Sequence, residues 1–78
     1  MAGLDHITFD PGIMGGRACV RGMRITVSLV LKLVASGMTT LEILKEYPTL
    51  QAEDIHQCLQ YAACLADEEI HPVTPSRP

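Results

Sequence analysis

Residues 26–63 read TVSLVLKLVASGMTTLEILKEYPTLQAEDIHQCLQYAA, and this segment contains the signals of three consecutive helices. A threonine before an apolar run, as at Thr26, caps the start of a helix, and Gly37 favours the left-handed conformation in which helices end. The sequence therefore predicts a first helix over residues 27–36. Apolar side chains cover most of its circumference, so most of this helix must be buried.

The second helix is predicted from a capping box and a proline. Thr39 and Glu42 have the spacing at which the side chain of each residue accepts a hydrogen bond from the backbone amide of the other. Pro48 disfavours the helical conformation of the residue before it, so this helix should end at Tyr47.

A third helix is predicted over residues 52–67, with Thr49 or Gln51 as its N-cap. The acids Glu53 and Asp54 suit the positive end of such a helix. The buried stripe is expected to contain the apolar residues at helical spacing, which are Ile55, Leu59, Ala62 and Ala66.

These elements indicate a mainly α fold: a homeodomain-like three-helix unit of the helix-turn-helix type, preceded by a short β-arm or hairpin. The arm is expected between Ile7 and Ile25, where two short β-prone runs flank the turn residues 10–12. The predicted domains are the arm over residues 1–26, the helical unit over 27–69, and a proline-rich disordered tail over 70–78.

The composition fits a small helical protein. Of the 78 residues, 47% are hydrophobic but only 4% aromatic, so the core must be aliphatic. This length is near the lower limit for an independent core, which favours a homodimer. The sequence contains no apolar run of membrane-spanning length and no signal-peptide pattern, so we expect a cytoplasmic protein without a membrane partner.

Charge is divided unevenly along the chain, whose net charge is −3. Residues 1–36 contain four basic and two acidic side chains, whereas residues 37–78 contain two basic and seven acidic ones. Phosphate contacts are therefore expected from the first half, and glutamines of the third helix have the chemistry to pair with adenine. The DNA-binding candidates, all expected to be exposed, are Arg17, Arg21, Arg24, Lys32, Gln51, His56, Gln57 and Gln60.

The acidic third helix leaves a second interpretation open, in which the protein is an interaction or dimerisation module that does not bind DNA. The apolar face of the first helix and the edge of the arm favour contact with a second subunit or a partner protein. The expected interface residues are Ile7, Phe9, Val20, Ile25, Val27, Val30, Leu31 and Val34.

No catalytic, metal or cofactor site is expected. Residues 11–17 are glycine-rich but lack the Gly-Lys-Ser/Thr ending of a phosphate-binding loop. The three cysteines lack zinc-site spacing and the three histidines lie far apart, so they are interpreted as free thiols and surface imidazoles. The chain is therefore predicted not to be an enzyme.

A series of short motifs, taken in order and spacing, is similar to one known family. The motifs are ITFDP at residues 7–11, GGR at 15–17, VRGMRITV at 20–27, GMT at 37–39, EI at 42–43, YP at 47–48, Leu50, EDI at 53–55, Leu59 and YA at 61–62. From residue 7 to about residue 63 the chain resembles the bacterial and archaeal family of unknown function numbered 433.

The resemblance implies a homeodomain-like fold after a β-arm, and a role as an antitoxin of the VapB type paired with a toxin that resembles PIN-domain ribonucleases. Gly22 and Arg24 match the positions that the family pattern marks most clearly, although no chemical role comes with them. Met23 stands where the family usually has Thr, and Gln51 stands where it usually has Thr or Ser. Both replacements weaken local capping only. We therefore predict an antitoxin that binds a PIN-like ribonuclease toxin and operator DNA; the alternative is a protein-interaction module that does not bind DNA.

Overall fold

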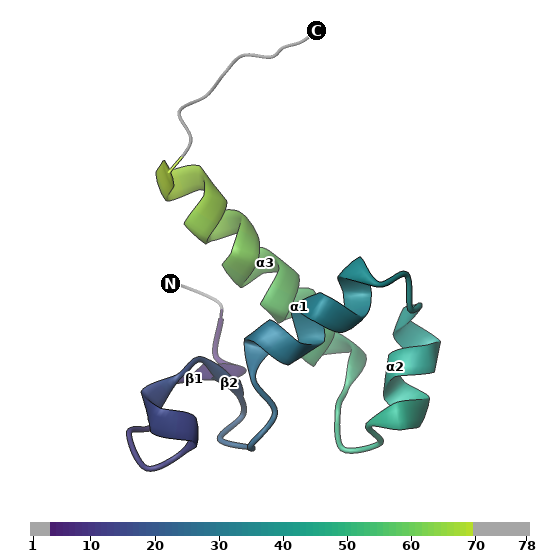
Figure 1. Ribbon diagram of the computed structural model, residues 1–78, viewed down its shortest axis with the longest axis horizontal. Helices are drawn as coiled ribbons and strands as arrows, with labels where there is room; N and C mark the ends of the chain where they lie inside the picture. Colours follow the sequence, from purple (N-terminus) through teal and green to yellow (C-terminus); the bar gives the residue numbers. More distant parts are fainter. Residues whose placement is uncertain (1–3, 70–78) are drawn as a thin grey trace, which may run out of the picture.

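Three helices follow an N-terminal hairpin (Figure 1), and this arrangement confirms the predicted mainly α fold class. The computed structural model describes residues 4–69, with side chains for residues 4–67. The predicted tail at residues 70–78 lies outside the described residues. The elements are β1 (Ile7–Thr8), the 3-10 helix η1 (Met14–Gly16), β2 (Cys19–Val20), α1 (Val27–Ala35), α2 (Thr40–Glu46) and α3 (Ala52–Glu69).

The predicted arm is a short antiparallel hairpin. Ile7 of β1 lies opposite Val20 of β2, and Thr8 lies opposite Cys19. A tight turn follows β2 at Arg21 and Gly22, which adopt φ values of 45° and 72°. Glycine has no Cβ to clash in this left-handed region, so Gly22 allows the chain to reverse directly after β2.

The signals read from the sequence define both ends of α1 and the start of α2. The Thr26 hydroxyl accepts a hydrogen bond of 3.0 Å from the Leu29 amide, and Gly37 has a φ of 99° after the last turn of α1. The capping box is complete, because the Glu42 amide donates to the Thr39 hydroxyl and the Thr39 amide donates to the Glu42 carboxylate. These helices therefore begin and end as predicted, within one residue.

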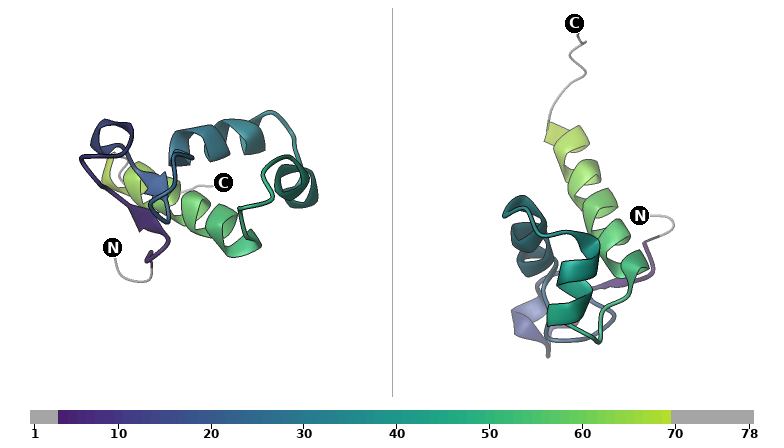
Figure 2. Two further views of the ribbon diagram at one scale, coloured as in Figure 1. Left: turned by 90° about the horizontal axis from the view of Figure 1, so that it is seen from below. Right: turned by 90° about the vertical axis from the view of Figure 1, so that its right-hand side faces the viewer.

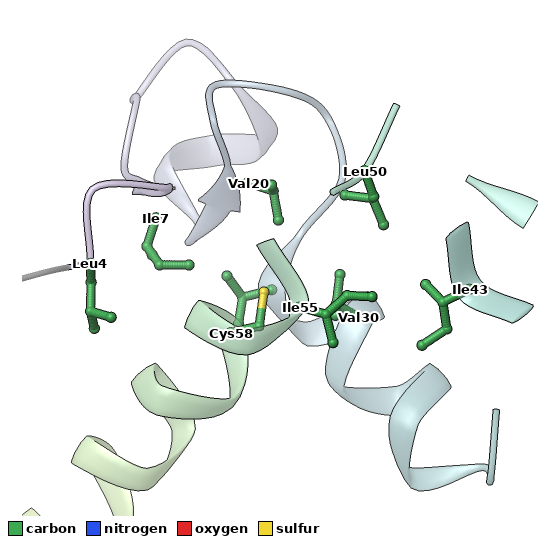
Figure 3. Packing of buried hydrophobic residues seen from close by; sticks show 9 residues of the cluster. Leu4, Ile7, Val20, Val30, Ile43, Leu50, Ile55 and Cys58 are labelled. Carbon is green, nitrogen blue, oxygen red and sulfur yellow. The ribbon is translucent and has the colours of Figure 1, made fainter. Parts of the chain in front are cut away.

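The core lies where α1, α2, the start of α3 and the hairpin meet (Figure 3). Val20, Val30 and Ile43 are fully buried there and come from β2, α1 and α2. Cys58 of α3 is equally buried, and Ile7 and Val27 complete the hairpin and α1 sides. The hairpin is thus part of the core and not a separate arm.

This packing corrects the predicted interface. Ile7, Val20, Val27 and Val30 belong to the chain's own core, because α1 and the hairpin strand β1 both pack against α3. The other members, Ile25, Leu31 and Val34, are partly buried against the core, and Phe9 alone of the eight is exposed.

The buried face of α3 also differs from the predicted stripe. Ile55 is buried as expected, but Leu59 is 43% exposed and Ala66 is exposed. The buried side chains of the first two turns are instead Asp54, Ile55, Gln57 and Cys58. Beyond these turns α3 continues past the rest of the molecule, so its C-terminal half projects from the body (Figures 1 and 2).

Candidate functional site

A buried carboxylate anchors the hairpin to α3. Asp54 sits in the first turn of α3, where its side chain is fully buried. Its oxygens accept hydrogen bonds from Arg21 Nε and Nη2, both at 2.9 Å, and from the Gln51 amide at 2.7 Å. His6 Nδ1 lies 2.5 Å from the same carboxylate. Asp54 therefore caps its own helix and binds two residues of the hairpin region.

These bonds determine the ionisation of Asp54. Burial opposes the charged form and raises the pKa, but the hydrogen bonds from Arg21, Gln51 and His6 outweigh it, so the pKa lies below its usual value. The hydrogen bond to Asp54 in turn raises the pKa of Arg21. The pair is thus held in its charged form at neutral pH.

A second polar connection lies one turn further along α3. Gln57 is only 3% exposed. Its side-chain oxygen accepts from the His6 amide at 2.8 Å, and its nitrogen donates to the carboxylates of Asp5 and Glu53 at 3.1 Å each. The hydrogen bond from Gln57 lowers the pKa of Asp5. Gln57 therefore has its donors and its acceptor satisfied within the chain.

Two predicted DNA contacts are consequently engaged inside the molecule. Gln57 was expected to be exposed but is buried, because α3 turns this residue toward the chain segment before β1. The Arg21 guanidinium remains about one third exposed, yet Asp54 balances its charge and the Thr49 carbonyl accepts a further bond from it at 2.8 Å. Arg21 thus contributes less than an unpaired cation to binding phosphates.

The remaining candidates are exposed and fall into two groups. Gln51, His56 and Gln60 lie at the N-cap and along the first turns of α3. Arg17, Arg24 and Lys32 come from the hairpin segment and α1. The polar and the basic candidates therefore come from different elements of the chain.

An apolar groove runs between α1 and the projecting half of α3, with a volume of about 590 Å³. Leu31 and Ala35 line it from α1, and Tyr61 and Leu65 from α3. Phe9 lies beside it, because its ring centroid is 6.1 Å from that of Tyr61. Among the lining residues that the structure describes, the charged side chains are two cations, Arg17 and Lys32.

Sequence reasoning missed both the Asp54 cluster and the groove. His6 was interpreted as a surface imidazole, although it binds Asp54 across 48 residues of sequence. One signal for Asp54 was present: it stands three residues after Gln51, the position from which a side chain accepts a hydrogen bond from the N-cap backbone amide. The groove had no comparable signal, since three separate segments form it.

The described part of the chain offers no metal site and no membrane span. Among residues 4–69, no three histidine, cysteine or acidic side chains are grouped to hold a metal ion, and no helix there is long and apolar enough to cross a bilayer.

Burial raises the pKa of the Cys58 thiol to about 11, with a further rise from the Asp54 charge. Such a thiol stays protonated and unreactive at neutral pH.

Known proteins are similar to this chain in sequence and in fold. The family model described as "Protein of unknown function (DUF433)" matches residues 7–62. The uncharacterized protein y4eO of Sinorhizobium fredii is 38% identical over 61 residues, which are 78% of this chain and 28% of that protein. The crystal structure of a DUF433 member protein from Anabaena variabilis matches with a TM-score of 0.72 and 32% identity, covering 81% of this chain and 62% of that chain. The chain thus spans less than two thirds of either relative.

Proposed function

Given that the chain belongs to the DUF433 family, we propose that it is an antitoxin-type regulator that binds operator DNA and a PIN-like ribonuclease toxin. The observation that carries this proposal is the helix pair formed by α2 and α3. At the start of α3, Gln51, His56 and Gln60 are exposed. In helix-turn-helix proteins, polar residues at this position enter the major groove and contact base edges.

The chemistry of DNA binding is divided between two sets of residues. The amides of Gln51 and Gln60 can each form a bidentate pair with adenine. Phosphate neutralisation falls to Arg17, Arg24 and Lys32, because the Arg21 charge is balanced by Asp54. Glu53 lies among the α3 residues and repels phosphate, so this proposal requires more than one copy of the basic set on the DNA.

Toxin binding is supported by apolar side chains that the described residues leave uncovered. Leu41 of α2 is 75% exposed and Phe9 of the hairpin segment is 53% exposed. Aromatic side chains such as Phe9 are enriched at protein interfaces.

The DNA half is tested by measuring affinity for the duplex upstream of its own gene and for a random duplex, at about 150 mM salt. We expect a preference of about a thousandfold or more for the upstream duplex. Gln60→Ala should lower that preference about tenfold, whereas Arg24→Ala should weaken both affinities alike. Cys64→Ser, on the same helix, is the control and should change neither. Equal affinity for both duplexes would contradict this half of the proposal.

The toxin half is tested with a purified PIN-like ribonuclease that co-purifies with the chain from its host. Adding the chain should abolish RNA cleavage at a one-to-one ratio. Phe9→Ala should weaken inhibition, and Met14→Ala, which also truncates an exposed apolar side chain of the hairpin segment, serves as the control. A ribonuclease that stays fully active in excess chain rules out the antitoxin role.

A protein-interaction module without DNA binding is the second candidate, and one observation favours it. The structure engages Arg21 with Asp54, and the other basic side chains of residues 4–36, Arg17, Arg24 and Lys32, form no salt bridge with another described residue in a chain with a net charge of −3. Under this alternative, ribonuclease inhibition persists while both duplexes bind equally weakly. The two tests together therefore separate the candidates.

A further inference from the structure

The groove between α1 and α3 is an apolar surface with a charged edge of one sign. Leu31, Ala35 and Tyr61 give it apolar walls, and Arg17 and Lys32 supply its charge. Leu65, which lines its α3 side, is 46% exposed. An occupant of matching chemistry presents apolar side chains together with carboxylates.

The C-terminal half of α3 has this chemistry. It presents Leu65, and its last turns contain Asp67, Glu68 and Glu69 without any basic residue. Acids are unfavourable at this end of a helix, where the backbone dipole is negative, and a nearby cation relieves the repulsion. Asp67, the one of these acids whose side chain the structure describes, is exposed and forms no salt bridge with another described residue. Among the described residues, Asp67 therefore lacks a cation partner of the kind that the groove of another copy provides.

We propose that a second copy of this chain fills the groove, with the C-terminal half of its α3 packed antiparallel against the first copy's α3 and against α1. A two-fold axis near Leu65 brings Leu65 of each copy into the other's groove. The acids one turn further along then approach Arg17 and Lys32 of the opposite copy. Both copies use the same surface, as an isologous dimer requires.

The shape of the molecule fits this arrangement. The 18 residues of α3 span about 27 Å at the usual rise of 1.5 Å per residue. Its first turns pack into the core, whereas the rest projects past the body where a second copy has access to it (Figures 1 and 2). A dimer also enlarges the apolar core of a 78-residue chain, which is small for a protein that folds alone. The dimer does not depend on the DNA or toxin functions, but its contacts occupy Arg17 and Lys32, so that Arg24 is the basic candidate it leaves for phosphate contacts.

The test is sedimentation of the full chain from about 1 to 200 µM, since association is concentration-dependent. Wild type should form a dimer in this range. Leu65→Glu places a charge in the groove of each copy and should leave a monomer with an unchanged circular dichroism spectrum. Leu41→Glu, at the exposed leucine of α2, is the matched control and should remain dimeric.

Charge reversal identifies the partner surface itself. Lys32→Glu and Asp67→Lys should each weaken the homodimer about tenfold or more, because each creates two symmetric repulsions. A mixture of the two single variants should form a heterodimer of near wild-type affinity, since both of its charge contacts are then attractive. Lys45→Glu on α2 is the control and should not respond to Asp67→Lys.

Three outcomes overturn the proposal. A monomer at all concentrations means that another occupant, such as residues 70–78 or a small apolar molecule, covers the groove. A dimer that survives Leu65→Glu uses a different surface. Single variants that weaken the dimer but do not recover on mixing show that Lys32 and Asp67 do not face each other.

Discussion

The two halves of α3 invert the usual distribution of side chains. The first half buries polar groups, Asp54 and Gln57, in contact with the hairpin region. The second half exposes apolar groups, with Leu65 at the groove and the helix running past the body. The difference shows that one continuous helix serves two purposes: its start fixes the fold of its own chain, and its end is available to another.

The inversion has a simple physical basis. Polar groups can be buried when their hydrogen bonds are satisfied, and the carboxylate of Asp54 has a guanidinium, an imidazole and a backbone amide around it. Exposed leucines cost little in a single copy, but they gain free energy when a partner covers them. Stability measurements on single variants should therefore distinguish the two halves.

The largest effect is expected for Asp54→Asn. The substitution removes the charge that Arg21 pairs with and weakens the cap of α3, so the free energy of unfolding should fall by about 3 kcal/mol. Urea unfolding followed by circular dichroism measures it, in dilute solution. Glu46→Gln neutralises an exposed acid of α2 and should change stability by less than about 0.5 kcal/mol. Equal effects of the two variants would mean that Asp54 does not hold the hairpin.

A smaller loss is expected for Gln57→Ala. Truncation leaves the partly buried His6 amide without an acceptor and the buried end of α3 without the Gln57 side chain, which should cost about 2 kcal/mol. Gln60→Ala, on the exposed side of the same helix, is the matched control and should cost less than about 0.5 kcal/mol. The comparison sharpens the contrast within the first half of α3, where only one of two nearby glutamines is predicted to matter.

Acid should reduce the stability that Asp54, in the first half of α3, contributes to the fold. Because the pKa of Asp54 is lower in the folded than in the unfolded chain, its contribution to stability is complete above the unfolded value near 3.8 and is lost as the pH falls through the lower folded value. The free energy of unfolding should therefore decrease only slightly between about pH 7 and pH 4, and more steeply below about pH 4. Repeating the titration with Asp54→Asn should remove most of this acid dependence; a slope identical to wild type would assign it to other carboxylates.

The smallest effect on the single chain is expected for Leu65→Ala. Although leucine truncation in a core costs several kcal/mol, this side chain is nearly half exposed and its loss should cost less than about 0.5 kcal/mol in dilute solution. Ile43→Ala, in the fully buried core, is the contrasting variant and should cost about 3 kcal/mol. A large loss for Leu65→Ala at low concentration would place this half of α3 within the chain's own core.

The local elements could be predicted from the sequence because their signals are local. Thr26, the Thr39 capping box and Pro48 act on neighbouring backbone groups, so the bounds of α1 and α2 followed from residue types alone. The mainly α class with an N-terminal hairpin followed from the same signals.

The candidate site could not be predicted, because it depends on contacts between distant segments. Asp54 meets Arg21 across 33 residues and Gln57 meets His6 across 51 residues. Helical periodicity cannot indicate that a buried position will be polar when its hydrogen-bond partners belong to another element. The expected stripe through Leu59 was wrong for this reason: it assumed that the buried face of α3 is apolar.

The same long-range contacts order the events of synthesis. The hairpin segment is made first, but the side chains that hold it, at residues 54 and 57, are added only after most of the chain exists. Until then β1 and β2 form only a two-stranded hairpin, which is marginally stable by itself in water. We therefore expect the helices to collapse first and the hairpin to dock last, when the start of α3 becomes available to it.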